Sequence, residues 1–407
     1  GEAKVDNKDF EGKDVQQLIS FVAAQPGVQL DGTGDPRMGM VGASYGGGIQ
    51  FVTAATDCRV DAIVPIIAWN SLESSLYKAG VPKNGWASIL TSVSALGKID
   101  PHIPAAKKTG DETGTVSQEN LDWFRSRGPG ALVEDVTVPT LIVQGTVDTL
   151  FTLAEGVTNY EVVNDNGVPV AMVWFCGGHG LCNAKVGDKG RVGKDIIGWL
   201  DRYVKDDTSA AKVPGFDFVD QDGQRYTAPK WPLTAGDPIT ASGSGTLELT
   251  KDSRSEGPVS AATADDTVGR LSEQIMPGIA KVAVDVKIPF GDRSALVVGA
   301  PTLQLTYTGT VPDGPQPEAV FAQLVDTANQ KVVGQQVTPV ALQLDGRAHS
   351  LKVDLEMIAF AAKAGQSMTL QLVATTSAYA TPRLGGSVDF SKIVVSLPTV
   401  TNARSSG

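Results

Sequence analysis

The residues with the clearest chemical potential lie in the segment Gly42-Ala43-Ser44-Tyr45-Gly46-Gly47, which follows the apolar run 38–43 and precedes a helical stretch. This is the G-x-S-x-G pattern of a nucleophile elbow, in which a serine occupies a tight turn between a strand and a helix. The turn puts the Ser44 hydroxyl at the helix amino terminus, where the backbone N–H of Tyr45 can stabilise an oxyanion. The alternative is a glycine-rich turn whose serine only caps the helix.

A serine hydroxyl is a weak nucleophile and needs a general base. The chain offers three histidines. His102 falls in a segment predicted to form a cap, and His349 falls in the β-rich second half. Only His179 follows a predicted strand of the α/β part, within the run Phe175-Cys176-Gly177-Gly178-His179-Gly180. The glycines allow this loop to bring the ring over the sheet edge, so we expect His179 to be the base.

The carboxylate that orients the base is expected at the end of an earlier strand. The apolar run 139–144 is followed by Gly145-Thr146-Val147-Asp148, which puts Asp148 at the same sheet edge. The order Ser44, Asp148, His179 is the order expected of an α/β-hydrolase. The alternative for Asp148 is a simple turn former.

Two cysteines flank the candidate base. Cys176 and Cys182 lie close enough in sequence to form a disulfide, while Cys58 has no partner nearby. The C-x2-H-x2-C spacing around His179 also resembles zinc-ligand spacing, but no fourth ligand is evident and zinc would withdraw the base from Ser44. Two free thiols are the alternative in a cytoplasmic protein. On the cysteine pair we expect an exported protein, secreted or in the cell envelope. The polar amino terminus, without a signal core, fits a removed leader or else a cytoplasmic location.

Composition excludes several classes of function. The 407 residues carry 34 Lys and Arg against 45 Asp and Glu, a net charge of −11, without a basic run. This balance argues against nucleic-acid binding, which requires clustered basic residues. The longest strongly apolar stretch, 62–69, is far shorter than the roughly 20 residues that span a bilayer. With 42% hydrophobic residues the chain can bury a large core. We expect neither a metal nor an organic cofactor.

The elements that position these residues divide the chain into two parts. Buried strands are predicted at 38–43, 60–68, 139–144 and 168–175, alternating with helices such as 9–24 and 196–204. This pattern predicts a mostly parallel sheet covered on both faces. Residues 1–76 and 131–212 would form this α/β core, and 77–130 a helical cap inserted between its two parts. Alternating segments then predict an all-β sandwich or jelly roll over 213–407. These segments are 245–250, 282–288, 303–307, 320–325, 351–355 and 368–374.

The chain resembles the X-prolyl dipeptidyl peptidase and cocaine-esterase group of serine hydrolases. The match rests on residues 42–47, 57–65, 138–148 and 177–180. The resemblance implies an α/β-hydrolase core, a helical cap and a carboxy-terminal jelly-roll domain. It also implies acyl-enzyme chemistry on an ester or amide, with Ser44, His179 and Asp148 as nucleophile, base and orienter.

The chain departs from this family before its nucleophile elbow. Only 43 residues precede Ser44, supplying one helix and one strand, whereas the family has several strands there. The family's second oxyanion donor, commonly a tyrosine hydroxyl, comes from that upstream part and has no match here. We therefore expect an upstream fragment of the same precursor, removed or retained as a second chain.

These observations predict a serine hydrolase that cleaves an ester or a short peptide, of the carboxylesterase or X-prolyl-peptidase type. Trp69 and Asn70 follow the predicted strand 60–68 and are candidates for substrate binding, although such residues more often pack between sheet and cap. The alternative function is a non-catalytic binding or assembly protein that kept the triad residues on a scaffold with an incomplete oxyanion hole.

Overall fold

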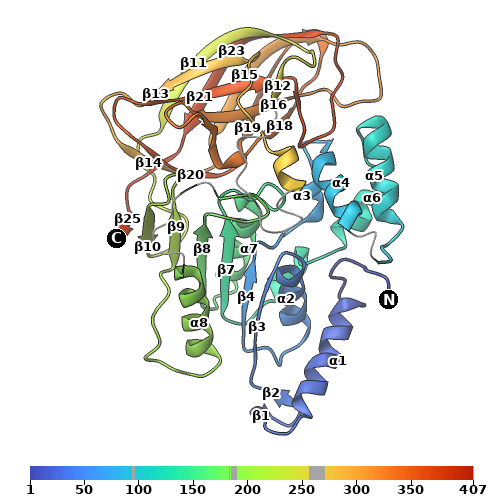
Figure 1. Ribbon diagram of the computed structural model, residues 1–407, viewed down its shortest axis with the longest axis vertical. Helices are drawn as coiled ribbons and strands as arrows, with labels where there is room; N and C mark the ends of the chain where they lie inside the picture. The colour runs from blue at the N-terminus through green and yellow to red at the C-terminus, as the bar shows by residue number, and fades with distance from the viewer. Residues whose placement is uncertain (94–96, 183, 185–189, 256–270, 407) are drawn as a thin grey trace.

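The computed structural model describes residues 1–407 except 94–96, 183, 185–189, 256–270 and 407. Within these residues, a seven-stranded sheet forms the core and a β-domain lies across one end of it (Figure 1). The core strands, in sheet order, are β25 (Arg404–Ser406), β10 (Arg225–Ala228), β9 (Phe216–Val219), β8 (Val170–Phe175), β7 (Thr140–Gly145), β4 (Ala62–Ile66) and β3 (Gly39–Ala43).

The strands from β9 to β3 run parallel, and β10 and β25 are antiparallel to their neighbours. The interior strand β7 is buried along its whole length, as is typical of parallel strands covered on both faces. The carboxyl ends of β7 and β8 point toward the β-domain (Figure 1). Loops that follow the core strands therefore meet at the boundary between the two parts.

Helices cover both faces of the core sheet. One face packs against α1 (Glu11–Ala23), α2 (Tyr45–Thr56) and α7 (Leu153–Asp165), through Ile19, Phe51 and Val157. The other face packs against α8 (Arg191–Tyr203), whose Trp199 is 5% exposed. In the part of the chain that the structure describes, no helix combines the length and the apolar character that crossing a bilayer requires.

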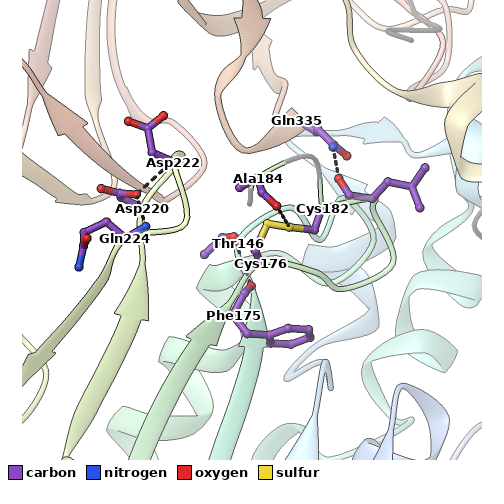
Figure 2. Close-up of a disulfide and its surroundings, with 10 residues drawn as sticks. Thr146, Phe175, Cys176, Cys182, Ala184, Asp220, Asp222, Gln224 and Gln335 are labelled. Carbon is purple, nitrogen blue, oxygen red and sulfur yellow. Dashed lines mark hydrogen bonds between the residues drawn. A yellow bond between two sulfur atoms is a disulfide. The ribbon is translucent and has the colours of Figure 1, made fainter. Parts of the chain in front are cut away.

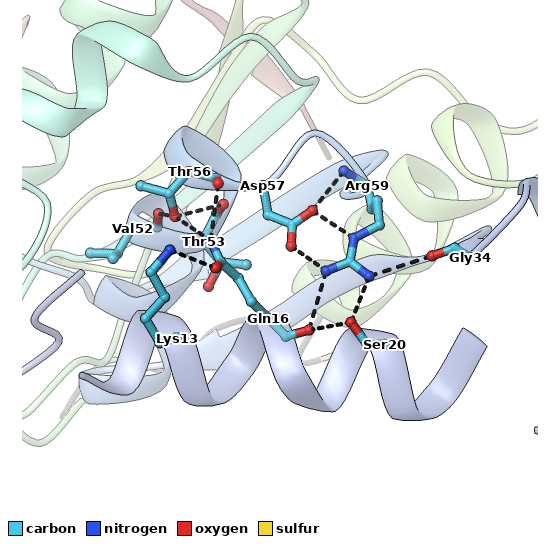
Figure 3. A network of polar contacts seen from close by, with 9 residues as sticks. All are labelled: Lys13, Gln16, Ser20, Gly34, Val52, Thr53, Thr56, Asp57 and Arg59. Carbon is cyan, nitrogen blue, oxygen red and sulfur yellow. Dashed lines mark hydrogen bonds and ion pairs between the residues drawn. The ribbon is translucent and has the colours of Figure 1, made fainter. Parts of the chain in front are cut away.

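A single arginine fixes α1 to the turn between α2 and β4 (Figure 3). The Arg59 guanidinium donates to both carboxylate oxygens of Asp57, at 2.9 and 2.6 Å, and to the carbonyl of Gln16 and the hydroxyl of Ser20 on α1. The hydrogen bonds from Arg59 to the Asp57 carboxylate lower the pKa of Asp57. The segment 57–65, which carried part of the family resemblance, thus holds a helix in place as well as supplying β4.

The cap lies beside the carboxyl ends of the core strands. It begins after α3 (Leu72–Leu76) with a small hairpin and continues with three helices, followed by a 3-10 turn that leads back to β7. These elements are β5 (Tyr77–Lys78), β6 (Val81–Pro82), α4 (Asn84–Val93), α5 (His102–Thr113), α6 (Gln118–Arg125) and η2 (Gly130–Asp135). These elements lie in the chain between β4 and β7, and the bounds 77–130 for a helical cap stay a prediction.

The β-domain is a sandwich of two antiparallel sheets. One sheet has the order β11-β23-β15-β19 and the other β13-β21-β16-β17, with β18 also paired to β16. Their inward-facing residues, such as Leu305 and Leu370, form one buried cluster. The long strands are β11 (Ile239–Glu248), β13 (Val284–Pro289), β15 (Thr302–Thr310), β16 (Ala319–Asp326), β19 (Asp345–Asp354), β21 (Ser367–Val373) and β23 (Ser387–Leu397). Each of the six predicted segments overlaps one of these strands.

Shorter elements complete the described chain. They are β1 (Leu30–Gly32), β2 (Asp35–Pro36), β12 (Arg254–Ser255), η3 (Glu273–Ile275), β14 (Ala295–Gly299), β17 (Lys331–Val332), η4 (Val333–Gln335), β18 (Thr338–Ala341), β20 (Ile358–Ala362), β22 (Thr375–Thr376) and β24 (Thr399–Val400). Among them, η4 lies between β17 and β18 and faces the core.

The predicted boundary at residue 212 is too early. The strands β9 and β10 follow this boundary yet extend the core sheet, and β25 joins that sheet from the far end of the sequence. Short strands in a β-rich stretch carry no sequence signal for the sheet they join, because pairing is decided by contacts far away in the chain.

Candidate active site

The turn between β3 and α2 has the geometry of a nucleophile elbow. Ser44 has φ 56° and ψ −118°, a backbone conformation that L-residues rarely adopt. Its neighbours must be small: a Cβ on Gly42 would lie 2.6 Å from the carbonyl oxygen of Gly46, and one on Gly47 would lie 2.8 Å from that of Ile66. Gly42 is therefore required by a backbone contact within the turn and Gly47 by a backbone contact with β4, whereas a Cβ on Gly46 would meet no atom within 4 Å.

A residue that the sequence analysis missed holds this turn together. Gln50 is fully buried on α2, and its Nε2 donates to the carbonyls of Gly42, at 3.1 Å, and Gly46, at 2.6 Å. Its Oε1 accepts the N–H of Val64 on β4, at 3.0 Å. The signal available in the sequence was the one amide side chain in a short helix that has no charged residue.

The structure brings Ser44, His179 and Asp148 together in one line of hydrogen bonds. The Nδ1 of His179 lies 2.8 Å from Asp148 Oδ2, and its Nε2 lies 2.8 Å from Ser44 Oγ. A carboxylate only accepts hydrogen bonds, so Nδ1 carries the proton and Nε2 is free to accept the serine proton. This is the tautomer that a general base requires.

The other two histidines lack this arrangement. His102 and His349 each bond one aspartate, at 2.7 and 2.8 Å, but among the described residues no serine bonds the second nitrogen of either ring. The side chain of His179 is also the most buried of the three, at 9% exposure against 33% and 23%. The edges of Trp86 and Phe151 enclose its ring, with centroid distances of 5.7 and 5.2 Å.

The carboxylate of Asp148 is fully buried and held on both oxygens. Oδ1 accepts the backbone N–H groups of Leu150 and Phe151, at 3.0 and 2.9 Å. Oδ2 accepts the backbone N–H of His179, at 3.1 Å, as well as its ring N–H. Asp148 can therefore stabilise its own turn through Oδ1 and orient the ring of His179 through Oδ2.

The cap also contributes to the loop that carries Asp148. Lys83 is 2% exposed, and its Nζ donates to the carbonyls of Thr149 and Leu150, at 3.0 and 3.1 Å. Burial lowers the pKa of Lys83 to about 8. Trp86 Nε1 donates to the hydroxyl of Thr149 at 3.0 Å. Sequence analysis missed both residues, since nothing in a local pattern relates the cap to this loop.

The loop around His179 is closed by a disulfide between Cys176 and Cys182 (Figure 2). Within it, Gly178 has φ 120°, and a Cβ there would lie 2.5 Å from the Cβ of Asp148. The zinc alternative requires the same two sulfurs and the same ring, which are occupied by the disulfide and the triad. Among the described residues no group of three or more His, Cys, Asp or Glu side chains is arranged to hold a metal.

The predicted oxyanion donor, the N–H of Tyr45, lies in the first turn of α2 beside Ser44. The Tyr45 hydroxyl accepts the N–H of Asp6 at 3.3 Å and donates to Glu11, the first residue of α1, at 3.1 Å. Burial, reinforced by the neighbouring charge of Glu11, raises the pKa of Asp6 to about 9. Asp6 is therefore an uncharged carboxyl at neutral pH, packed against Gly48 of the elbow helix.

Trp69 is buried next to the aromatic residues around His179, and Asn70 is half-buried. Trp69 is 2% exposed and packs on Phe151, with a centroid distance of 4.9 Å. The Asn70 side chain donates to Asn159 of α7, and its N–H donates to Glu155. In this conformation both residues support the wall of the site, and their role in substrate binding stays a prediction.

Comparisons with known proteins agree with this fold. Residues 1–181 match the family described as X-Pro dipeptidyl-peptidase (S15 family). Two crystal structures of a CocE/NonD family hydrolase from Staphylococcus aureus superpose on the chain with TM-scores of 0.68 and 0.67, at 13% and 12% identity. Each match covers 98% of this chain and 78% of that one. No curated protein sequence matches. The predicted resemblance is confirmed, as is the α/β-hydrolase core followed by a β-rich domain.

Proposed function

We propose that this chain is a serine hydrolase that cleaves an ester or amide bond through an acyl-enzyme, as a carboxylesterase or an X-prolyl-type peptidase does. The observation that carries the proposal is the unbroken hydrogen-bond line from Ser44 through His179 to Asp148. The strained backbone of Ser44 adds to it, because such strain persists where the surroundings enforce it and often marks a functional residue.

In the proposed reaction, His179 Nε2 takes the Ser44 proton while Oγ bonds to the substrate carbonyl carbon. The oxygen of that carbonyl gains a negative charge, which the Tyr45 N–H stabilises. The tetrahedral intermediate then collapses, and the imidazolium gives its proton to the departing alcohol or amine. Water repeats these steps on the acyl-enzyme, releasing the acid and restoring Ser44. Asp148 holds the ring in the required tautomer throughout.

The test is labelling with a fluorophosphonate probe, with the modified residue identified by peptide mass spectrometry. We expect the probe to modify Ser44 in the wild type and to leave Ser44→Ala unlabelled, since the probe reacts with activated serines. Ser71→Ala is the matched control, because the Ser71 hydroxyl caps the amino terminus of α3 by accepting the N–H of Ser74. Absence of labelling in folded wild-type protein would favour the non-catalytic scaffold instead.

An upstream fragment of the same precursor is part of the proposal. The strand β3 pairs with β4 on one side and leaves Val41 47% exposed, and Leu18 and Phe21 on nearby α1 are 61% and 63% exposed. Exposed apolar groups beside a free strand edge are typical of a surface that another segment covers. Intact-mass and sequencing analysis of purified native material should detect that fragment; a folded monomer of this chain alone would contradict it.

An exported location, secreted or in the cell envelope, is also proposed. The Cys176–Cys182 disulfide supports it, because structural disulfides persist in oxidising compartments. Mass spectrometry after alkylation of protein from its native source should find both thiols blocked by the disulfide. Finding them reduced would contradict an exported location.

A further inference from the structure

One turn of the β-domain reaches both catalytic loops. The turn η4 and the residue after it, Gln336, lie against the acid loop, defined here as residues 146–152, and the base loop, defined as residues 176–182. Gln336 is 7% exposed, and its Nε2 donates to the carbonyl of Asp148 at 2.8 Å. Its neighbour Gln335 donates from Nε2 to the carbonyl of Leu181 at 2.6 Å. Figure 2 shows Gln335 above the disulfide-closed loop.

The backbone of this turn adopts an uncommon conformation where it meets the acid loop. Gly334 and Gln335 have φ 60° and 57°, so two successive residues lie in the left-handed region. A Cβ on Gly334 would approach the carbonyl oxygen of Thr146 to 3.0 Å. Because a non-glycine residue adopts this region only where its surroundings enforce it, the conformation of Gln335 points to a function for the turn.

The contact between the turn and the base loop is limited in area, because a cavity lies beside it. A cavity of about 300 Å³ borders the turn and the base loop, lined in part by Cys176, Val333 and Gln335. Beside the turn, therefore, the base loop is not packed continuously against the β-domain. Two adjacent side-chain amides join this turn to the loops of the base and the acid, and the buried Glu356 of the sandwich also interacts with Thr152 of the acid loop.

The two catalytic loops need a fixed separation. A Cβ on Gly180 would lie 2.0 Å from the carbonyl of Val147, so the loops touch through their backbones. A small slide of one loop past the other changes the distance from Asp148 to His179, and then from His179 to Ser44. Hydrogen bonds from consecutive residues of one rigid turn oppose that slide.

We propose that Gln335 and Gln336 are positioning residues: the β-domain fixes the acid loop against the base loop through them. The inference rests on the proposed function, in which Asp148 and His179 act on Ser44. It assigns the β-domain a part in aligning Asp148 with His179, in addition to any role as a wall of the active site.

The test compares Gln335→Met, Gln336→Met and the double variant with the wild type. Methionine keeps the approximate size of glutamine and removes the donor. Saturation kinetics of fluorophosphonate labelling separate the first-order rate of Ser44 modification from the reversible binding constant of the probe. We expect the rate to fall about tenfold in each single variant, and further in the double variant, since a misplacement near 1 Å can cost about 100-fold. The binding constant should stay unchanged.

The control is Gln323→Met. Gln323 is buried at 1% exposure in the β-domain, and its Nε2 donates to the carbonyl of Gly278 at 2.8 Å, away from both loops. It should lower the melting temperature without changing the labelling rate of folded protein. If Gln336→Met does not fold, Gln335→Met decides, because Gln335 is only half-buried.

Amide hydrogen exchange provides a readout that does not depend on catalysis. The N–H groups of Val147, Leu150, Phe151 and His179 are bonded within the two loops, and their exchange should accelerate in the double variant but not in Gln323→Met. A double variant with wild-type exchange and a wild-type labelling rate would overturn the inference. A wild type that is never labelled at Ser44 would overturn the proposed function, while exchange still decides the role of the turn.

Discussion

Replacing His179 with alanine should lower kcat for hydrolysis of p-nitrophenyl acetate by about a million-fold, the scale on which loss of a triad base acts in serine hydrolases. The reason is that Ser44 Oγ loses its proton acceptor at 2.8 Å. Neither Trp86 nor Phe151, which enclose the ring, can replace it as a base. The measurement is steady-state hydrolysis by the purified variant, with Ser44→Ala as the background.

The chain provides its own controls for this prediction. His102→Ala and His349→Ala remove the other two histidines, each bonded to an aspartate in a similar way. Both variants should retain the wild-type rate, because in the described part of the chain neither ring bonds a serine. A His179→Ala variant that hydrolyses the ester as fast as these two would contradict the assignment of the base.

Asp148→Asn should lower kcat by about 10,000-fold with little change in the fold. The two N–H groups of Leu150 and Phe151 fix where the amide oxygen goes, since only an oxygen can accept them. The amide NH2 then faces His179 Nδ1 and forces the ring proton onto Nε2. In that tautomer Nε2 cannot accept the proton of Ser44.

Asp345→Asn is the matched control, because Asp345 bonds His349 at the same distance of 2.8 Å in an exposed pair. It should leave hydrolysis unchanged. Ester hydrolysis and circular dichroism, measured on both variants, separate a loss of catalysis from a loss of folding. Equal activity in Asp148→Asn and Asp345→Asn would show that Asp148 is only a turn former.

Much of the core could be predicted because buried parallel strands appear in sequence as short apolar runs. The runs 38–43, 60–68, 139–144 and 168–175 correspond to β3, β4, β7 and β8. Once these strands are ordered, the residues that follow them share one sheet edge. The line from Ser44 to Asp148 was therefore within reach of sequence reasoning, although its distances were not.

The residues that support the triad could not be predicted in the same way. Gln336 bonds the carbonyl of a residue 188 positions earlier, and Lys83 bonds carbonyls 66 and 67 positions later. Such contacts depend on how three parts of the chain pack, and no local pattern specifies them. The helix at 11–23 shows a different limit: the sequence predicts the helix but not which of its apolar residues are buried, since Leu18 on it is 61% exposed.

The strand β25 has a consequence for the order in which the molecule is made. Residues 404–406 pair with β10, so the sequence of the whole sandwich is inserted between two neighbouring strands of the core sheet. During synthesis at about 5–20 residues per second, β10 waits roughly 10–35 s for this neighbour to leave the ribosome. The sandwich becomes complete only shortly before β25, because its interior strand β23 ends at Leu397. Completion of the core sheet is thereby coupled to folding of the domain that carries Gln335 and Gln336.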